Sequence, residues 1–252
     1  MRQGWTTVLA ALLVVTAGCA GFAPDGDETP AVTETATPTP SNPSAVTYPS
    51  GWNATGVNAS VALRSHYTAV LTGPSATVTY RSEVVESEGI PRRNTTLDMR
   101  LDTADRRLYA SIEGKTNHRI AYFADGTLSR WDARNETLVG QSSARFGEVA
   151  QSIDNGVLYS HLLLYDLEFE RTVRRQGTTA LVYDVTGAYS NTLSRTYGSA
   201  RDATGQVVVA ADGRVLEIET TVTYSEGTLR YHYAQTRVGE TDVAMPDWLS
   251  SA

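Results

Sequence analysis

The residue best suited to chemistry is Cys19, the only thiol among the 252 residues, which lies between small residues in the stretch VVTAGCAG. A cysteine thiolate is a good nucleophile and is suited to accepting a lipid chain. Cys19 follows an apolar run over residues 8–17 that is broken only by Thr16, and Arg2 supplies a basic start. This pattern is typical of a secretory signal peptide. The run is shorter than the roughly 20 residues that a membrane-spanning helix needs, so residues 1–18 are predicted to direct export and to be removed.

The sequence TAGC at residues 16–19 resembles the lipobox of prokaryotic lipoproteins, in which the cysteine becomes the lipidated first residue of the mature protein. The resemblance implies lipid attachment at Cys19 and a protein held at the outer face of the cell membrane, exposed to the exterior. Two chains on one cysteine anchor a protein stably, whereas one chain binds only marginally. The alternative is an ordinary signal peptide that is cleaved near an incidental cysteine. With a single cysteine, no disulfide forms within the chain.

Residues 19–51 are predicted to be the lipidated cysteine and a disordered stalk. Pro, Thr, Ser and acidic residues dominate residues 20–51, and apolar residues are too sparse to build a core. Such a composition favours an extended spacer, which at about 3.1 Å per residue reaches up to roughly 90 Å. The Thr and Pro content suits O-glycosylation, and an unmodified linker is the alternative.

Four Asn-x-Ser/Thr triplets are candidate N-glycosylation sites on an exported chain. They begin at Asn53, Asn58, Asn94 and Asn135. Such triplets also arise by chance in a Thr-rich sequence. Asn58 is the weakest candidate, because it is also placed to cap a helix.

The four histidines, His66, His118, His161 and His232, are far apart, and no two have the spacing of metal ligands. We expect His66 and His161 to be hydrogen-bonded core residues, because both lie on apolar stripes of predicted helices. Only if the side chains of His66 and His161 lay close together would the histidines indicate a polar site. The sequence contains no GxSxG elbow, HExxH pair, P-loop or GxGxxG motif. We therefore predict that the protein is not an enzyme and has no cofactor or metal site.

The chain is acidic, with a formal net charge of −7 from 28 acidic and 21 basic residues, and Lys115 is its only lysine. An acidic chain without a basic run argues against binding to nucleic acid. Low lysine content with many Asp, Glu and Thr residues resembles proteins of salt-loving archaea, in which carboxylates hold water in concentrated salt. A GC-rich genome that favours arginine codons is the alternative.

Residues 52–252 carry enough apolar pattern for one domain. The period of the apolar residues predicts a helix that starts with Asn58 or Ser60 as its cap and stops at Gly73-Pro74. Helices are also predicted over 146–153 and 157–165, interrupted at residues 154–156, and a closing tail over 243–249 is expected to pack Trp248. A period of two predicts strands near residues 77–84, 97–102, 108–112, 118–124, 127–133, 168–175, 180–187, 205–211, 214–225 and 228–238. Asp125-Gly126, between two of these strands, predicts a tight hairpin turn.

Thirteen tyrosines against four phenylalanines are a mild bias. Tyrosines can line a groove that is apolar with polar tips. They also suit strands that have one wet face, and this second interpretation is the one we favour.

The order of elements predicts an α+β fold: a curved, mostly antiparallel sheet, an open half-barrel, covered on its concave face by a few helices. An early helix leading into SATVTYRSEV, a meander, a central helical pair and a final hairpin are similar to the LolA/LppX-type lipoprotein carriers. The resemblance implies an apolar cavity between sheet and helices that holds lipid. It rests on the order of elements and assigns no binding residue.

The sequence therefore favours a membrane-anchored, exported lipoprotein that binds or carries a lipid or other apolar ligand. The alternative is a cell-surface interaction or envelope module without a ligand cavity, which would have a filled core and an exposed apolar or aromatic patch. A hydrolase would need a converged polar cluster, and the sequence shows none.

Overall fold

The structure is a computed structural model that describes residues 46–87, 89, 92–189 and 196–250. These residues belong to one compact unit, Pro40–Ala252. The predicted signal peptide, Cys19 and the stalk up to residue 45 lie outside the described residues, so the expectations for them stay predictions.

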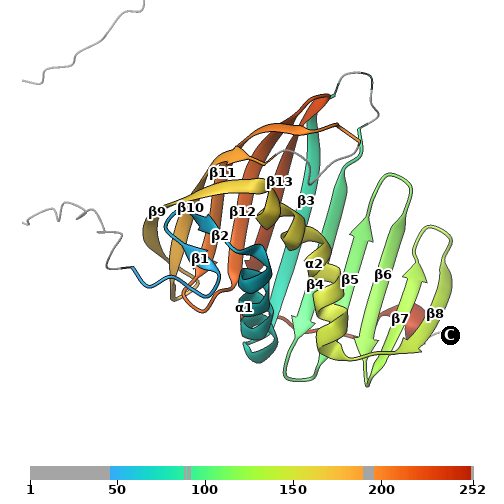
Figure 1. Ribbon diagram of the computed structural model, residues 1–252. Helices are drawn as coiled ribbons and strands as arrows, with labels where there is room; N and C mark the ends of the chain where they lie inside the picture. The colour runs from blue at the N-terminus through green and yellow to red at the C-terminus, as the bar shows by residue number, and fades with distance from the viewer. Residues whose placement is uncertain (1–45, 88, 90–91, 190–195, 251–252) are drawn as a thin grey trace, which may run out of the picture. The chain divides into compact units, whose positions relative to one another are not determined.

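Among the described residues, eleven strands form one antiparallel sheet whose edge strands do not meet, so the sheet is an open, curved half-barrel (Figure 1). The strands are β3 (Ala76–Ser87), β4 (Thr95–Asp102), β5 (Arg107–Glu113), β6 (His118–Ala124), β7 (Thr127–Asp132), β8 (Thr137–Ser143), β9 (Tyr165–Arg175), β10 (Thr178–Ala188), β11 (Ala200–Ala210), β12 (Val215–Tyr224) and β13 (Gly227–Thr236). Their order across the sheet is β8-β7-β6-β5-β4-β3-β13-β12-β11-β10-β9. Two meanders, β3–β8 and β9–β13, are thus joined where β3 pairs with β13.

The predicted alternation of strand residues is confirmed in β4. Leu97, Met99 and Leu101 are at most 4% exposed, whereas Arg100 is exposed to solvent. The hairpin predicted at residues 125–126 is also confirmed, because Asp125 and Gly126 have φ angles of 50° and 76° between β6 and β7. Two positive φ angles are what a tight type I′ turn requires.

Helix α1 (Ala59–Thr72) follows the predicted pattern. The side chain of Asn58 accepts a hydrogen bond from the backbone N–H of Val61, which caps the first turn. Its buried stripe includes Ala62, Leu63, His66, Tyr67 and Val70, and the helix ends before Gly73. The prediction that Asn58 serves as a helix cap is confirmed.

Helix α2 (Phe146–Leu164) is one continuous helix, so the predicted pair of helices with a break at residues 154–156 is wrong. Gly156 costs about 1 kcal/mol inside a helix. That cost is offset because Leu158 and Leu162, two and six residues further on, are at most 2% exposed. Asp154 is also 2% exposed and contacts His66 of α1, so its side chain serves the helix contact and not a turn.

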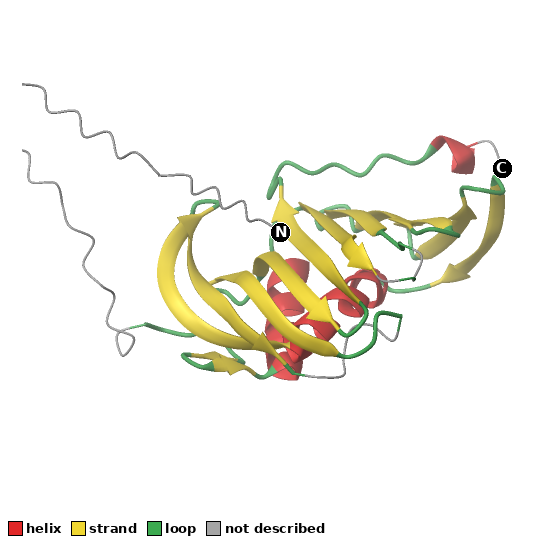
Figure 2. Ribbon diagram, turned by 90° about the horizontal axis from the view of Figure 1, so that it is seen from above, coloured by secondary structure: helices red, strands yellow, loops and turns green. Residues whose placement is uncertain are grey.

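Both helices lie on the concave face of the sheet, as predicted, and the strands curve around them (Figure 2). A small hairpin of β1 (Trp52–Asn53) and β2 (Gly56–Val57), which the sequence did not reveal, places Trp52 against Tyr183 with ring centroids 4.9 Å apart. Edge strand β8 was also missed, because its exposed residues lack alternation.

The C-terminal segment crosses the opposite, outer face of the sheet and ends in the short helix α3 (Asp247–Ser250) (Figure 2). Trp248 stacks on Trp131 of β7, with ring centroids 5.2 Å apart and an angle of 13° between the planes. The predicted packing of Trp248 is confirmed.

Candidate functional site

The two helix histidines are buried, as predicted, since His66 is 0% and His161 is 1% exposed. They do not converge into one site. His66 of α1 contacts Asp154, and His161 lies two turns further along α2 than Asp154, a rise of about 10 Å. Each histidine has its own set of partners.

His66 joins α1, α2 and β12 in the interior. The backbone N–H of Val215 donates to His66 Nδ1 at 3.0 Å, and His66 Nε2 lies 3.0 Å from Asp154 Oδ2. Because Nδ1 accepts, the hydrogen-bond network assigns the proton to Nε2, which donates to Asp154. The hydroxyl of Tyr233 lies 3.5 Å from the same carboxylate oxygen. Burial, followed by the nearby Asp154 charge, raises the pKa of Tyr233 above its ordinary value.

His161 belongs to a second buried network. Its Nδ1 lies 2.7 Å from the hydroxyl of Tyr165, which also shares a hydrogen bond with Thr220. Its ring packs against Tyr231 with centroids 4.7 Å apart. Burial lowers the pKa of His161 to about 3. The imidazole is therefore neutral over the ordinary pH range and acts as a hydrogen-bonding core group.

The tyrosine bias has a different cause from the one expected. Tyr183, Tyr224, Tyr231 and Tyr233 are at most 4% exposed and face the helices in the main core. The hydroxyls of Tyr224 and Tyr231 lie 2.8 Å apart and share a hydrogen bond. Their rings fill the curved sheet, and the hydroxyls of Tyr224 and Tyr231 are satisfied by each other, so a wet strand face does not explain these residues.

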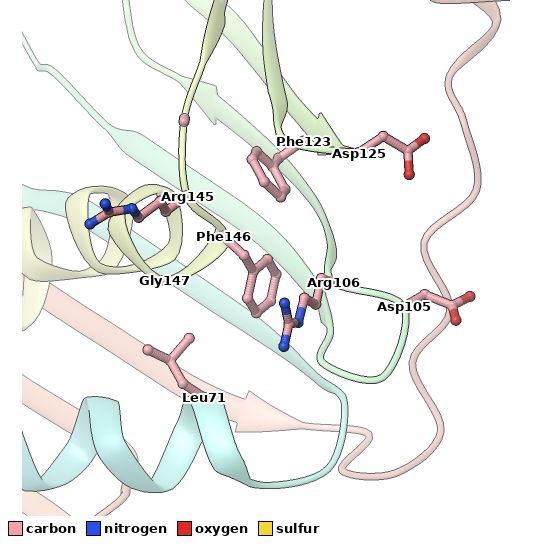
Figure 3. Close-up of a pocket in the computed structure, with 10 residues that line it drawn as sticks. Leu71, Asp105, Arg106, Phe123, Asp125, Arg145, Phe146 and Gly147 are labelled. Carbon is pink, nitrogen blue, oxygen red and sulfur yellow. The ribbon is translucent and has the colours of Figure 1, made fainter.

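A cavity of about 600 Å³ opens where α2 begins, beside the C-terminal end of α1 and the turns after β4 and β6 (Figure 3). We call it the α2 cavity. Its lining residues are Leu71, Asp105, Arg106, Phe123, Asp125, Gly126, Ala144, Arg145, Phe146 and Gly147. The rings of Phe123 and Phe146 lie 6.0 Å apart, and with Leu71 they form an apolar floor. Phe146 and Leu71 are only partly buried, so apolar surface stays open to a ligand.

A second hollow of about 410 Å³ lies between α1 and α2. Its lining includes Leu63, Tyr67 and Leu71 from successive turns of α1, with Gln151 and Tyr159 from α2. Leu71 lines both hollows. The apolar floor of the α2 cavity therefore continues along the contact between the two helices.

Sequence reasoning did not identify the residues of the α2 cavity. Leu71, Phe123 and Phe146 fit the apolar pattern of their elements and are indistinguishable from core residues by spacing. The sequence did offer one signal for the cavity: Phe123 lies just before a turn and Phe146 lies at the start of a helix. The hollow lies at the margin of the helix–sheet interface, where α1 ends and α2 begins, and not between the two layers, where the apolar cavity was expected.

The four predicted glycosylation residues, Asn53, Asn58, Asn94 and Asn135, are all exposed. Asn58 has its side chain engaged in the α1 cap. The Asn135 side chain donates to Asp132 Oδ2 at 2.9 Å. The Asn94 side chain accepts from the backbone N–H of Val84. Glycosylation at each of them stays a prediction.

Within the described part of the chain, no group of three or more His, Cys, Asp or Glu residues is arranged to hold a metal ion. In the same residues, no helix has the length and apolar character needed to span a membrane.

Comparison with solved structures gives distant similarities in fold. LprF from Mycobacterium bovis is 11% identical with a TM-score of 0.39, and covers 75% of this chain and 96% of its own. LppX from Mycobacterium tuberculosis is 14% identical with a TM-score of 0.33, covering 73% and 96%. A LolA superfamily protein from Nitrosomonas europaea is 10% identical with a TM-score of 0.27, covering 76% and 96%.

A search of curated proteins found no match. A family model described as "Family of unknown function (DUF7537)" matches residues 5–252. Because the match spans nearly the whole sequence, the chain belongs to this family of unknown function.

Proposed function

We propose that this protein is a binding protein, not an enzyme, and that it holds a lipid or other apolar ligand in the α2 cavity. The observation that carries the proposal is the floor made by Leu71, Phe123 and Phe146, of which Leu71 and Phe146 stay partly exposed in a hollow of about 600 Å³. Covering such apolar surface with an apolar ligand is favourable by about 25 cal/mol for each Å² removed from water.

The size and shape of the hollow support a chain-like ligand. Ligand pockets in proteins have volumes of about 300–1,000 Å³ and are lined mainly by apolar side chains. The α2 cavity lies in this range, and Leu71 links it to the hollow between α1 and α2. A linear apolar chain thus has a path from Phe146 along α1 toward Leu63.

The direct test is chemical. The compact unit, residues 40–252, is purified without Cys19, extracted with organic solvent and analysed by mass spectrometry for lipids that copurify. A lipid present in about equimolar amount supports the proposal. An empty extract, together with no binding of a dansyl-labelled undecanoate by fluorescence titration, contradicts it.

Replacing Ala144 with tryptophan is expected to weaken binding of dansyl-undecanoate by at least about tenfold, because the indole occupies the hollow beside Phe146. Ala144 is partly buried at the lining of the cavity. The matched control is Ala211→Trp in the exposed turn after β11, which adds the same ring away from the cavity. Equal affinities for the two variants would place the ligand elsewhere.

We also propose that the protein is attached to the outer face of the cell membrane through lipid on Cys19. The support is the sequence: an apolar run that ends in TAGC, followed by a Pro/Thr-rich spacer. The change Cys19→Ser is expected to move the protein from the membrane fraction to the medium, measured by immunoblotting. A serine variant that stays with the membrane would refute lipid attachment at this position.

A second candidate, a surface interaction module, has one favouring observation. Strand β8 is an edge of the sheet, and Val139 in its centre is 65% exposed. Exposed edge strands are surfaces on which another chain can add a strand. An empty extract combined with loss of self-association or partner binding in Val139→Lys would favour this function over ligand binding.

A further inference from the structure

One charged side chain points into the α2 cavity. Arg106 lies in the turn between β4 and β5, and its guanidinium extends toward Phe146 (Figure 3). The turn is held by Asp102, whose carboxylate accepts hydrogen bonds from the backbone N–H groups of Ala104 and Asp105, each at 3.1 Å. The position of Arg106 is therefore set by a fixed turn, even though its side chain is exposed.

The other charges around the cavity do not neutralise Arg106. The side chains of Asp105 and Asp125 point away from the cavity, and so does that of Arg145 (Figure 3). Arg145 is instead paired with Glu148, with Nη1 and Oε1 3.3 Å apart. Within the described residues Arg106 has no hydrogen bond or ion pair of its own, so its charge is available to a ligand.

The start of α2 adds to the positive potential on the same side. Phe146 and Gly147, the first two residues of this helix of 19 residues, line the cavity. The preceding residue, Arg145, makes no side-chain cap, so the first N–H groups of the helix lack the usual acceptor. The helix dipole favours negative charge at this end, where Glu148, paired with Arg145, is the acidic residue of the first turn.

We infer that the ligand of the α2 cavity is an anionic amphiphile, whose apolar chain lies on Leu71, Phe123 and Phe146 and whose negatively charged headgroup is bound by Arg106. This inference rests on the proposed function and names its ligand class. A carboxylate and a phosphate share the required chemistry, because both accept hydrogen bonds from a guanidinium. Arg106 is then the residue that discriminates between charged and neutral ligands of equal chain length.

The test compares dansyl-undecanoate with its methyl ester, which has the same chain and label but no charge. The wild-type protein is expected to bind the acid about tenfold more tightly than the ester, the effect of one charge-assisted hydrogen bond. Arg106→Gln is expected to bring the two affinities together by weakening the acid alone. Arg107→Gln is the matched control, since Arg107 borders a hollow on the outer face with Tyr122 and Met245 and should leave the preference intact.

Competition experiments distinguish the headgroup from a free anion. Decyl phosphate is expected to displace dansyl-undecanoate from the wild-type protein, whereas inorganic phosphate at the same concentration is not. Displacement by inorganic phosphate alone would mean a simple anion site and would overturn the inference. Equal binding of acid and ester by the wild-type protein, or an unchanged preference in Arg106→Gln, would overturn it while leaving the apolar site intact. If neither acid nor ester binds, the proposed function itself fails.

Discussion

Replacing His66 with leucine is expected to lower the free energy of unfolding by about 3–5 kcal/mol, which is the usual cost of removing one partner of a buried pair. The change leaves the Asp154 carboxylate without its donor at 3.0 Å. It also leaves the backbone N–H of Val215 without an acceptor. For a domain of this size the midpoint of thermal unfolding should fall by roughly 10 °C, measured by circular dichroism.

Two controls separate this effect from a general loss of packing. The double change of His66 and Asp154 to leucine removes the stranded carboxylate as well, and is expected to be more stable than the single His66 variant. His118→Leu removes a partly exposed histidine that is bonded to Ser111 on β5, and should cost about 1 kcal/mol. A His66 variant as mild as the His118 variant would show that the buried pair contributes little to the fold.

We expect His161 to lower the free energy of unfolding in mild acid. Burial lowers the pKa of its imidazole from 6.5 to about 3. Between these pH values the unfolded chain therefore binds a proton at His161 that the folded protein does not bind. This contribution is absent above pH 6.5. As the pH falls from 6.5 toward 3 it destabilises the fold by up to about 1.4 kcal/mol per pH unit.

The measurement is urea unfolding at pH 7 and pH 5. The wild-type protein is expected to lose about 2 kcal/mol more between these pH values than His161→Gln. His161 is bonded to the hydroxyl groups of Tyr165 and Tyr80, and Tyr165 is bonded in turn to Thr220. Among the described residues, no charged partner of His161 therefore offsets the effect. His232→Gln, on the partly exposed part of β13, should keep the wild-type pH dependence. If the free energy of unfolding of His161→Gln fell between pH 7 and pH 5 as much as that of the wild-type protein, His161 would not be the cause of the pH dependence.

Local patterns explain why much of the fold was predictable. The Asn58 cap, the alternation of β4 and the Asp125-Gly126 turn are each determined by residues close in sequence, and the structure confirms all three. The break predicted within residues 154–156 failed for a tertiary reason. Asp154 has turn-forming chemistry, but its partner His66 lies on another helix, and no local rule reveals such a contact.

The candidate site was less predictable than the fold for a related reason. Phe123 and Arg106 belong to different hairpins, and Phe146 starts a helix that follows both. Each looks ordinary in its own segment: an apolar strand residue, a turn residue and a helix start. Their common feature is position at one end of the half-barrel, which depends on how the sheet curves around α1 and α2. The apolar cavity was anticipated as a class of site, but its residues required the structure.

The pairing of β3 with β13 also bears on how the chain folds. Each meander pairs neighbours in sequence, so it closes short loops at small entropic cost. The two meanders are joined by pairing between β3 and β13, the first and last long strands, as in the pairing of Thr77 with Thr236. Contacts between residues so distant in sequence form slowly. Until β13 arrives, the edge of β3 and the apolar inner face of both meanders stay exposed. A chain arrested before β13 is synthesised therefore presents an open strand edge to its neighbours, which makes the nascent protein prone to aggregation until its final strand is in place.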